Sequence, residues 1–146
     1  MRPAGVTLIA IYHYLAAAFV AVLGIGLFVG GKVISMLGGA DGFVLPKAGF
    51  LIGVVGGTAF LVFALIHAIA GFAVWSMKEW GRLLAIVLAV ISLVFAIPGL
   101  LLSAMTMHAF FGGYRVVRVL ISVLIIWYLL QPGIKTLFRG DLRLPS

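Results

Sequence analysis

The sequence predicts an all-α polytopic membrane protein, in which four transmembrane helices form an antiparallel bundle followed by a short cytoplasmic amphipathic tail. Apolar residues make up 65% of the 146 residues and charged residues only 9%, and the mean hydropathy is +1.35. Soluble domains carry about 25% charged residues, so this composition is typical of a chain surrounded by lipid. Four apolar stretches each approach or exceed the roughly 20 residues that cross a bilayer as a helix. We therefore expect one transmembrane domain over residues 1–146.

The first two predicted spans are residues 6–31 and 48–76. The first is longer than the apolar region of a cleavable signal peptide, so we expect it to remain in the protein. The connection between them is rich in glycine and holds Asp41 and Pro46, residues that favour turns. The second stretch exceeds the length that a bilayer needs, and we expect it to tilt or protrude.

The third and fourth predicted spans are residues 83–105 and 115–131. The charged segment 77–82 before the third span is short enough to predict a tight hairpin. Pro98 inside the third span predicts a kink. Arg115 and Arg118 stand at the start of the fourth span, and we expect their side chains to extend towards the lipid headgroups.

Residues 132–146 form the predicted amphipathic tail. Apolar side chains recur there at helical spacing, namely Ile134, Leu137, Phe138 and Leu142, and the basic residues Lys135, Arg139 and Arg143 lie on another face. Such a helix is expected to lie in the plane of the cytoplasmic headgroups, where its three basic residues bind anionic lipid. Because Gly140 interrupts the pattern, a solvated basic flank is the alternative.

The basic residues divide unevenly between the two sides of the predicted membrane. Six lie on the side of the termini, namely Arg2, Lys78, Arg82, Lys135, Arg139 and Arg143, and four lie opposite, namely Lys32, Lys47, Arg115 and Arg118. The positive-inside rule therefore predicts that both termini are cytoplasmic.

The residue types that are scarce in the chain exclude several classes of function. There is no cysteine, so we expect no disulfide and no metal site built on thiolates. The only carboxylates are Asp41, Glu79 and Asp141, all outside the predicted spans, which argues against ion-coupled transport. The scattered basic residues argue against nucleic acid as a partner. We also expect no catalytic residues, since no serine in a span has a base at a suitable spacing.

Two histidines, His13 and His67, lie at similar depths from the cytoplasmic side, roughly 10 Å and 14 Å along the first and second spans. Each lies on a stripe of small residues that favours helix packing, so we expect the two imidazoles to lie close together. One interpretation makes them axial ligands of a haem or chlorophyll. The other makes them interface histidines that hydrogen-bond to neighbouring groups.

The second span also carries glycine at every fourth position, at Gly49, Gly53 and Gly57. This spacing lets two helix backbones approach closely. The pattern fits packing within the chain and packing against another molecule, and the two interpretations can hold together.

Three short motifs mark the ends of the predicted spans. The chain opens with Arg2-Pro3-Ala4-Gly5-Val6, turns at Trp80-Gly81-Arg82 and closes with Trp127-Tyr128-Leu129-Leu130 and Pro132. These motifs resemble those of a group of small, uncharacterised four-span bacterial integral membrane proteins. The resemblance implies a multi-pass protein of the bacterial cytoplasmic membrane, and it implies no activity or site residue.

By elimination, the sequence predicts a non-enzymatic accessory subunit that packs against and stabilises a larger membrane complex. Its expected partners are membrane lipids and other integral membrane subunits. The alternative is a protein that binds or transports an apolar ligand or pigment, such as haem, chlorophyll, quinone or lipid, within the bundle. A channel would need several copies around a pore, because four apolar helices enclose no polar lumen.

Overall fold

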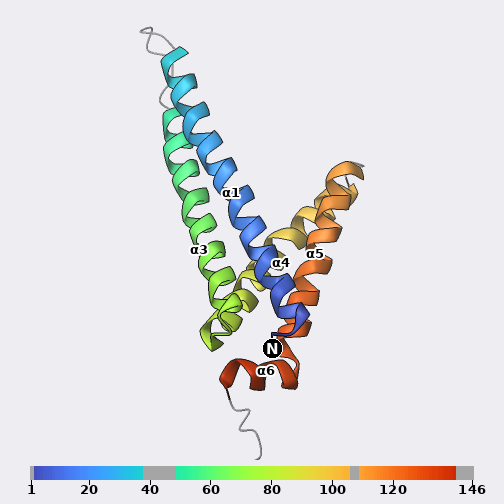
Figure 1. Cartoon of the computed structure of the whole chain (residues 1–146). Coiled ribbons are helices and arrows are strands. Elements are labelled where there is room, and N and C mark those ends of the chain that lie inside the picture. The colour runs from blue at the N-terminus through green and yellow to red at the C-terminus, as the bar shows by residue number, and fades with distance from the viewer. Residues whose placement is uncertain (1, 38–48, 106–108, 141–146) are drawn as a thin grey trace, which may run out of the picture. The chain divides into compact units, whose positions relative to one another are not determined.

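The computed structural model describes residues 2–37, 49–105 and 109–140, and within these ranges the chain is helical without strands. The long helices are α1 (Ala4–Leu37), α3 (Gly57–Trp75), α4 (Glu79–Met105) and α5 (Ala109–Leu130), followed by the short α6 (Pro132–Arg139) (Figure 1). A π-helical segment, η1 (Ile52–Gly56), leads directly into α3. The predicted all-α class is thus confirmed.

Within the described residues, three helical segments are long and apolar enough to cross a membrane: Ala4–Ile34, Gly49–Trp75 and Glu79–Pro98. A fourth crossing is possible if Arg115–Leu130 and Pro132–Arg139, which meet at 67°, count as one broken span. The structure therefore supports a membrane protein with three or four spans. The chain divides into two compact units, within each of which residues contact one another. One unit is Ile11–Ile69, and the second unit is Met1–Ala10 together with Ala70–Ser146. The four-helix antiparallel bundle remains a prediction.

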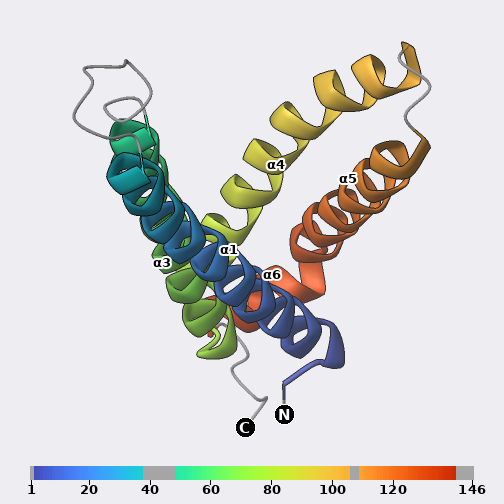
Figure 2. The same ribbon diagram turned by 90° about the horizontal axis from the view of Figure 1, so that it is seen from above.

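The unit Ile11–Ile69 is an antiparallel hairpin of α1 against η1 and α3, which lie side by side in two views (Figures 1 and 2). His13 contacts His67 near one end of the hairpin. Further along, Gly24 faces Gly57 and Gly31 faces Gly53. As the residue numbers of the contacts rise along α1, those of their partners fall along α3 and η1. The two helices are therefore antiparallel.

The second unit is built on the antiparallel hairpin of α4 and α5. Arg82 near the start of α4 contacts Leu129 near the end of α5, and Ser92 contacts Arg118. The start of α1 belongs to the same unit, where Gly5 lies against the ring of Tyr128. Arg2 stacks on the ring of Trp75, with its guanidinium 4.6 Å from the ring centre.

The predicted tight turn between α3 and α4 is confirmed at Ser76–Lys78. The amide of Lys78 donates to the carbonyl of Ala73, and that of Met77 donates to Val74, the pair of bonds that closes a helix with a Schellman motif. Met77 occupies the left-handed position, with φ 54°, where glycine is the usual residue. Gly81 lies so close to Ala73 that a side chain at this position would collide with it.

The predicted amphipathic helix in the tail forms as α6 but ends at Arg139. Gln131, with ψ 136°, breaks the path of α5, Pro132 begins the new helix, and Gly140 ends it with φ 71°. Ile134 and Phe138 are buried within the protein, whereas a helix that lies in the headgroup plane would turn this apolar face towards lipid. Leu142 and Arg143 lie outside the described residues. Pro98 lies inside the continuous helix α4.

Candidate functional sites

The two histidines predicted to be neighbours meet in the α1–α3 hairpin. Nδ1 of His13 lies 3.0 Å from Nδ1 of His67, and the ring of His13 is also edge-on to that of Tyr12. His13 is buried, with 1% of its surface exposed, and Phe63 packs beside the ring of His67. The prediction of proximity is therefore confirmed.

The hydrogen bond between the imidazoles accounts for only part of their polar groups. A neutral imidazole has one N–H donor and one bare nitrogen acceptor, so one Nδ1 donates and the other accepts. Nε2 of His13 is buried and has no hydrogen-bond partner among the described residues. Whichever ring donates, this atom is left as an unsatisfied donor or acceptor, which is unfavourable away from water.

The direct contact does not fit an ion held on the line between the two Nδ1 atoms, as in a haem or chlorophyll placed between the rings. Two metal–nitrogen bonds of about 2.0 Å each on opposite sides of the ion would separate the nitrogens by about 4 Å, whereas these atoms lie 3.0 Å apart. Nε2 of His13 alone remains as a possible axial ligand, and the role of both histidines in cofactor binding stays a prediction.

The glycines at every fourth position, Gly49, Gly53 and Gly57, pack against α1 inside the hairpin. A Cβ added at Gly53 would lie 2.7 Å from Cα of Gly31, and one added at Gly49 would lie 2.6 Å from the side chain of Ile34. Gly57 likewise packs against the ring of Phe28 and the backbone of Gly24. This confirms the close helix contact and favours the interpretation of packing within the chain.

Two other glycines, Gly26 and Gly30, are one helical turn apart on α1 and have nothing within 4 Å of an added Cβ. Within the unit Ile11–Ile69, they lie on a face of α1 that does not pack against α3. Neighbouring Gly31 makes the closest backbone contact of the hairpin, with an added Cβ only 2.5 Å from Cα of Gly53. The two adjacent glycines thus differ sharply in their surroundings.

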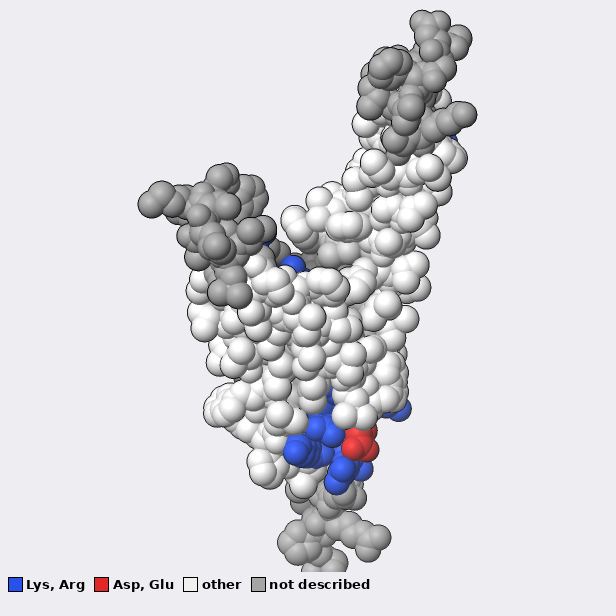
Figure 3. Space-filling view, turned by 180° about the vertical axis from the view of Figure 1, so that it is seen from behind, with Lys and Arg blue, Asp and Glu red and all other residues white. Residues whose placement is uncertain are grey.

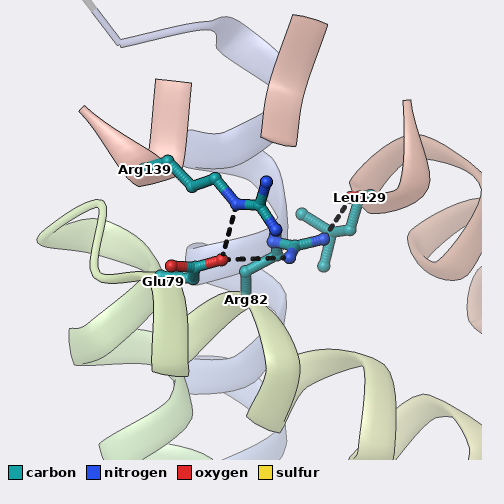
Figure 4. A network of polar contacts seen from close by, with 4 residues as sticks. All are labelled: Glu79, Arg82, Leu129 and Arg139. Atoms are coloured by element: carbon teal, nitrogen blue, oxygen red, sulfur yellow. Dashed lines mark hydrogen bonds and ion pairs between the residues drawn. The ribbon is translucent and has the colours of Figure 1, made fainter. Parts of the chain in front are cut away.

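A charged cluster that the sequence did not predict joins α4, α5 and α6 (Figure 4). Oε1 of Glu79 lies 3.0 Å from Nε of Arg139 and 3.6 Å from a terminal nitrogen of Arg82. The other terminal nitrogen of Arg82 donates to the carbonyl of Leu129 at 3.3 Å. Figure 3 shows charged side chains gathered at this end of the second unit, beside a largely uncharged surface.

Arg82 provides a hydrogen-bond donor to a carbonyl group at the end of α5. Carbonyl groups in the last turn of a helix lack amide partners, and here the chain turns away at Gln131 before Pro132, which has no N–H. The buried guanidinium of Arg82 supplies the missing donor to Leu129 and places positive charge at the negative end of the helix dipole. Its Nε has no hydrogen-bond partner among the described residues.

A second unpredicted contact lies in the middle of the α4–α5 hairpin. Nε of Arg118 donates to Oγ of Ser92 at 2.8 Å, and the hydroxyl of Ser122 donates to the carbonyl of Arg118 one turn back. The expectation that Arg118 extends towards headgroups is wrong, because its side chain is directed across to α4. Arg115 also has an interaction in the structure.

Of the residues predicted to bind lipid headgroups, Lys135 and Arg139 are described and Arg143 is not. Arg139 is exposed but paired with Glu79, so its charge is partly neutralised. The sequence carries no signal for the fold-back of α6, so it does not predict this cluster. Its only indication is that Glu79 and Arg139 are expected on the same side of the membrane.

No protein family model, no curated protein and no solved structure matches the chain.

Proposed function

We propose that the protein is a non-enzymatic accessory subunit of a larger membrane complex, which it enters by packing α1 against a partner helix. The single observation that best supports this is the open pair Gly26 and Gly30. Their four-residue spacing is the one that lets transmembrane helices approach closely. In the same helix, Gly31 uses such an approach to bind its own hairpin partner.

The proposed setting is a bacterial cytoplasmic membrane with both termini in the cytoplasm. The uneven division of basic residues supports this orientation. The cluster of Glu79, Arg82 and Arg139 would then lie at the cytoplasmic headgroups, with Lys135, Arg139 and Arg143 as the proposed contacts to anionic lipid.

Native mass spectrometry of the chain extracted in its own lipids tests this proposal. The expected result is a stoichiometric complex with at least one different integral membrane protein. Gly30→Leu should reduce the amount of this complex without changing the stability of the chain, because its side chain would occupy the proposed contact. Ala59→Leu, on the exposed surface of α3, is the matched control and should leave the complex intact. A chain that is only monomeric or self-associated would contradict the proposal.

A second candidate function, the binding of an apolar ligand or pigment, is favoured by one observation. Nε2 of His13 is buried without a partner among the described residues, and a bound ligand would satisfy it. Haem, chlorophyll or a quinone are the candidate ligands, and His13 would hold the ligand while His67 orients its ring. An absorption spectrum of the natively purified protein, compared with His13→Leu, tests the pigment. A lipid extract analysed by mass spectrometry tests the quinone.

A further inference from the structure

The contact between Arg118 and Ser92 lies deep in the α4–α5 hairpin. From the Arg82–Leu129 contact, Ser92 is ten residues further along α4 and Arg118 is eleven residues back along α5. At 1.5 Å per residue, each path is about 15 to 17 Å long. If the charged cluster at Arg82 marks the headgroups, this distance reaches the middle of a hydrocarbon core about 30 Å thick.

A guanidinium at that depth requires a counter-charge. Charged side chains inside a membrane are unfavourable and normally face a partner or a polar cavity. The only carboxylates of the chain are Asp41, Glu79 and Asp141. Glu79 is engaged in the cluster at the end of the hairpin, and the other two belong to sequence segments outside the apolar stretches. The spans themselves contain no acid that could neutralise Arg118.

The geometry of Arg118 leaves its strongest binding groups available. Its Nε is bonded to Ser92, which fixes the orientation of the guanidinium plane. Among the described residues, no ion pair involves its two terminal nitrogens. Those nitrogens form the edge that binds a carboxylate through two parallel hydrogen bonds. Arg118 is half-buried, so part of this residue is accessible from outside the hairpin.

We propose that Arg118, positioned by Ser92, binds a carboxylate from a transmembrane helix of a partner protein near the middle of the bilayer. The inference rests on the proposed function as a membrane subunit and names the chemistry of its partner, an apolar helix with one glutamate or aspartate at mid-depth. The complementary charge stabilises the complex and selects against apolar helices that lack an acid.

Association with designed transmembrane peptides tests this inference without knowledge of the natural partner. The probes are leucine-rich peptides of bilayer length with a central glutamate, or with a central glutamine in its place. Binding to the full chain in phosphatidylcholine vesicles is measured by fluorescence energy transfer. The glutamate peptide should bind about 3- to 30-fold more tightly than the glutamine peptide, because polar contacts between transmembrane helices contribute free energies in that range.

Three variants separate the charge contact from a loss of structure. Arg118→Gln should abolish the preference for the glutamate peptide. Arg118→Lys keeps the charge without the planar edge and should retain part of the preference. Lys78→Gln removes the same charge from an exposed turn residue and should leave the preference unchanged. Circular dichroism of each variant in the same vesicles verifies that the helices are formed.

Equal binding of both peptides to the wild-type chain would overturn the inference, as would a preference that persists in folded Arg118→Gln. Native mass spectrometry separates this failure from failure of the proposed function. A stoichiometric complex in the cell that survives Arg118→Gln undiminished would overturn the role of Arg118 while the subunit proposal stands. If the wild-type chain forms no such complex, the subunit proposal fails, whichever peptide binds better.

Discussion

At the scale of single residues, the His13–His67 contact joins the two helices of a hairpin whose backbones approach closely at glycine. Nδ1 of one ring donates to Nδ1 of the other over 3.0 Å, and the burial of His13 excludes water as a substitute. Removal of one ring leaves the remaining Nδ1 without this bond, whereas removal of both takes away donor and acceptor together. The two kinds of variant should therefore differ in stability.

We expect His13→Leu and His67→Leu each to lower the free energy of unfolding, with a coupling of about 1 kcal/mol between them. The double variant should be less destabilised than the sum of the two single variants, because no polar atom of the pair is left behind. Unfolding in mixed detergent micelles, followed by circular dichroism, measures all four proteins. Additive effects would show that the two rings do not interact.

Met77 has a left-handed backbone conformation, from which we predict the effect of a substitution. Its φ of 54° is unfavourable for a residue with a Cβ, by about 1 kcal/mol, and the surrounding Schellman hydrogen bonds hold it there. Met77→Gly should therefore raise the free energy of unfolding by up to about 1 kcal/mol, less the greater freedom of glycine in the unfolded chain. Leu15→Gly, at an exposed position in the interior of α1, should instead be destabilising. A loss of stability in Met77→Gly would contradict the strained conformation.

At the scale of helices, adjacent glycines on α1 provide a matched pair of substitutions. An added Cβ at Gly31 would collide with the backbone of Gly53, whereas one at Gly30 meets nothing within 4 Å. Gly31→Ala should therefore force the hairpin apart and lower the free energy of unfolding by about 1–3 kcal/mol. Gly30→Ala should be neutral or slightly stabilising, because alanine is the better helix former. Equal stability of the two variants would show that the glycine contact does not hold the hairpin together.

The attachment of α6 shows which of two interactions dominates. The ion pair between Glu79 and Arg139 is partly exposed, with 42% and 56% of the side chains accessible, and such pairs contribute about 0.2–1 kcal/mol. Phe138 is buried, and truncation of a buried phenylalanine to alanine is unfavourable by about 3–5 kcal/mol. Phe138→Ala should therefore release α6, whereas Glu79→Gln should not.

Hydrogen exchange of the amides in residues 132–139 measures this release. Phe138→Ala should remove most of the protection of α6, and Glu79→Gln should reduce it only slightly and less so at high salt. Leu137→Ala, on the half-buried side of the same helix, is the control for a change in apolar volume. Strong deprotection in Glu79→Gln would show instead that the ion pair holds α6.

The helices could be predicted from the sequence because apolar length, flanking charges and turn residues mark each one, but α1 continues to Leu37 and α5 begins at Ala109, beyond the predicted spans. The direction in which each side chain points was harder to infer, since helices that are apolar on all sides carry no clear periodicity. His13 and His67 were exceptions, because small residues beside them marked the contacting faces. Arg118 and Ser92 had no such marker, and the fold-back of α6 onto Glu79 depends on packing that no local pattern encodes.

At the scale of the whole molecule, the sidedness of the membrane topology can be tested directly, because the chain contains no native cysteine. Helix α1 is continuous over 34 residues, about 50 Å at 1.5 Å per residue, which exceeds the thickness of the hydrocarbon core. Its first turn, at Gly5, lies beside Tyr128 at the end of α5 that leads into α6. If α1 crosses the membrane, Met36 near its far end and Thr136 on α6 must therefore lie on opposite sides.

Single Met36→Cys and Thr136→Cys variants should react from opposite sides with a maleimide that does not cross membranes. Both positions are exposed, so a lack of reaction from one side reports topology and not burial. The positive-inside rule predicts that intact cells label Met36→Cys and that inverted vesicles label Thr136→Cys. The reverse pattern would retain the crossing and overturn the cytoplasmic location of the termini. Labelling of both variants from one side would show that α1 does not span the membrane.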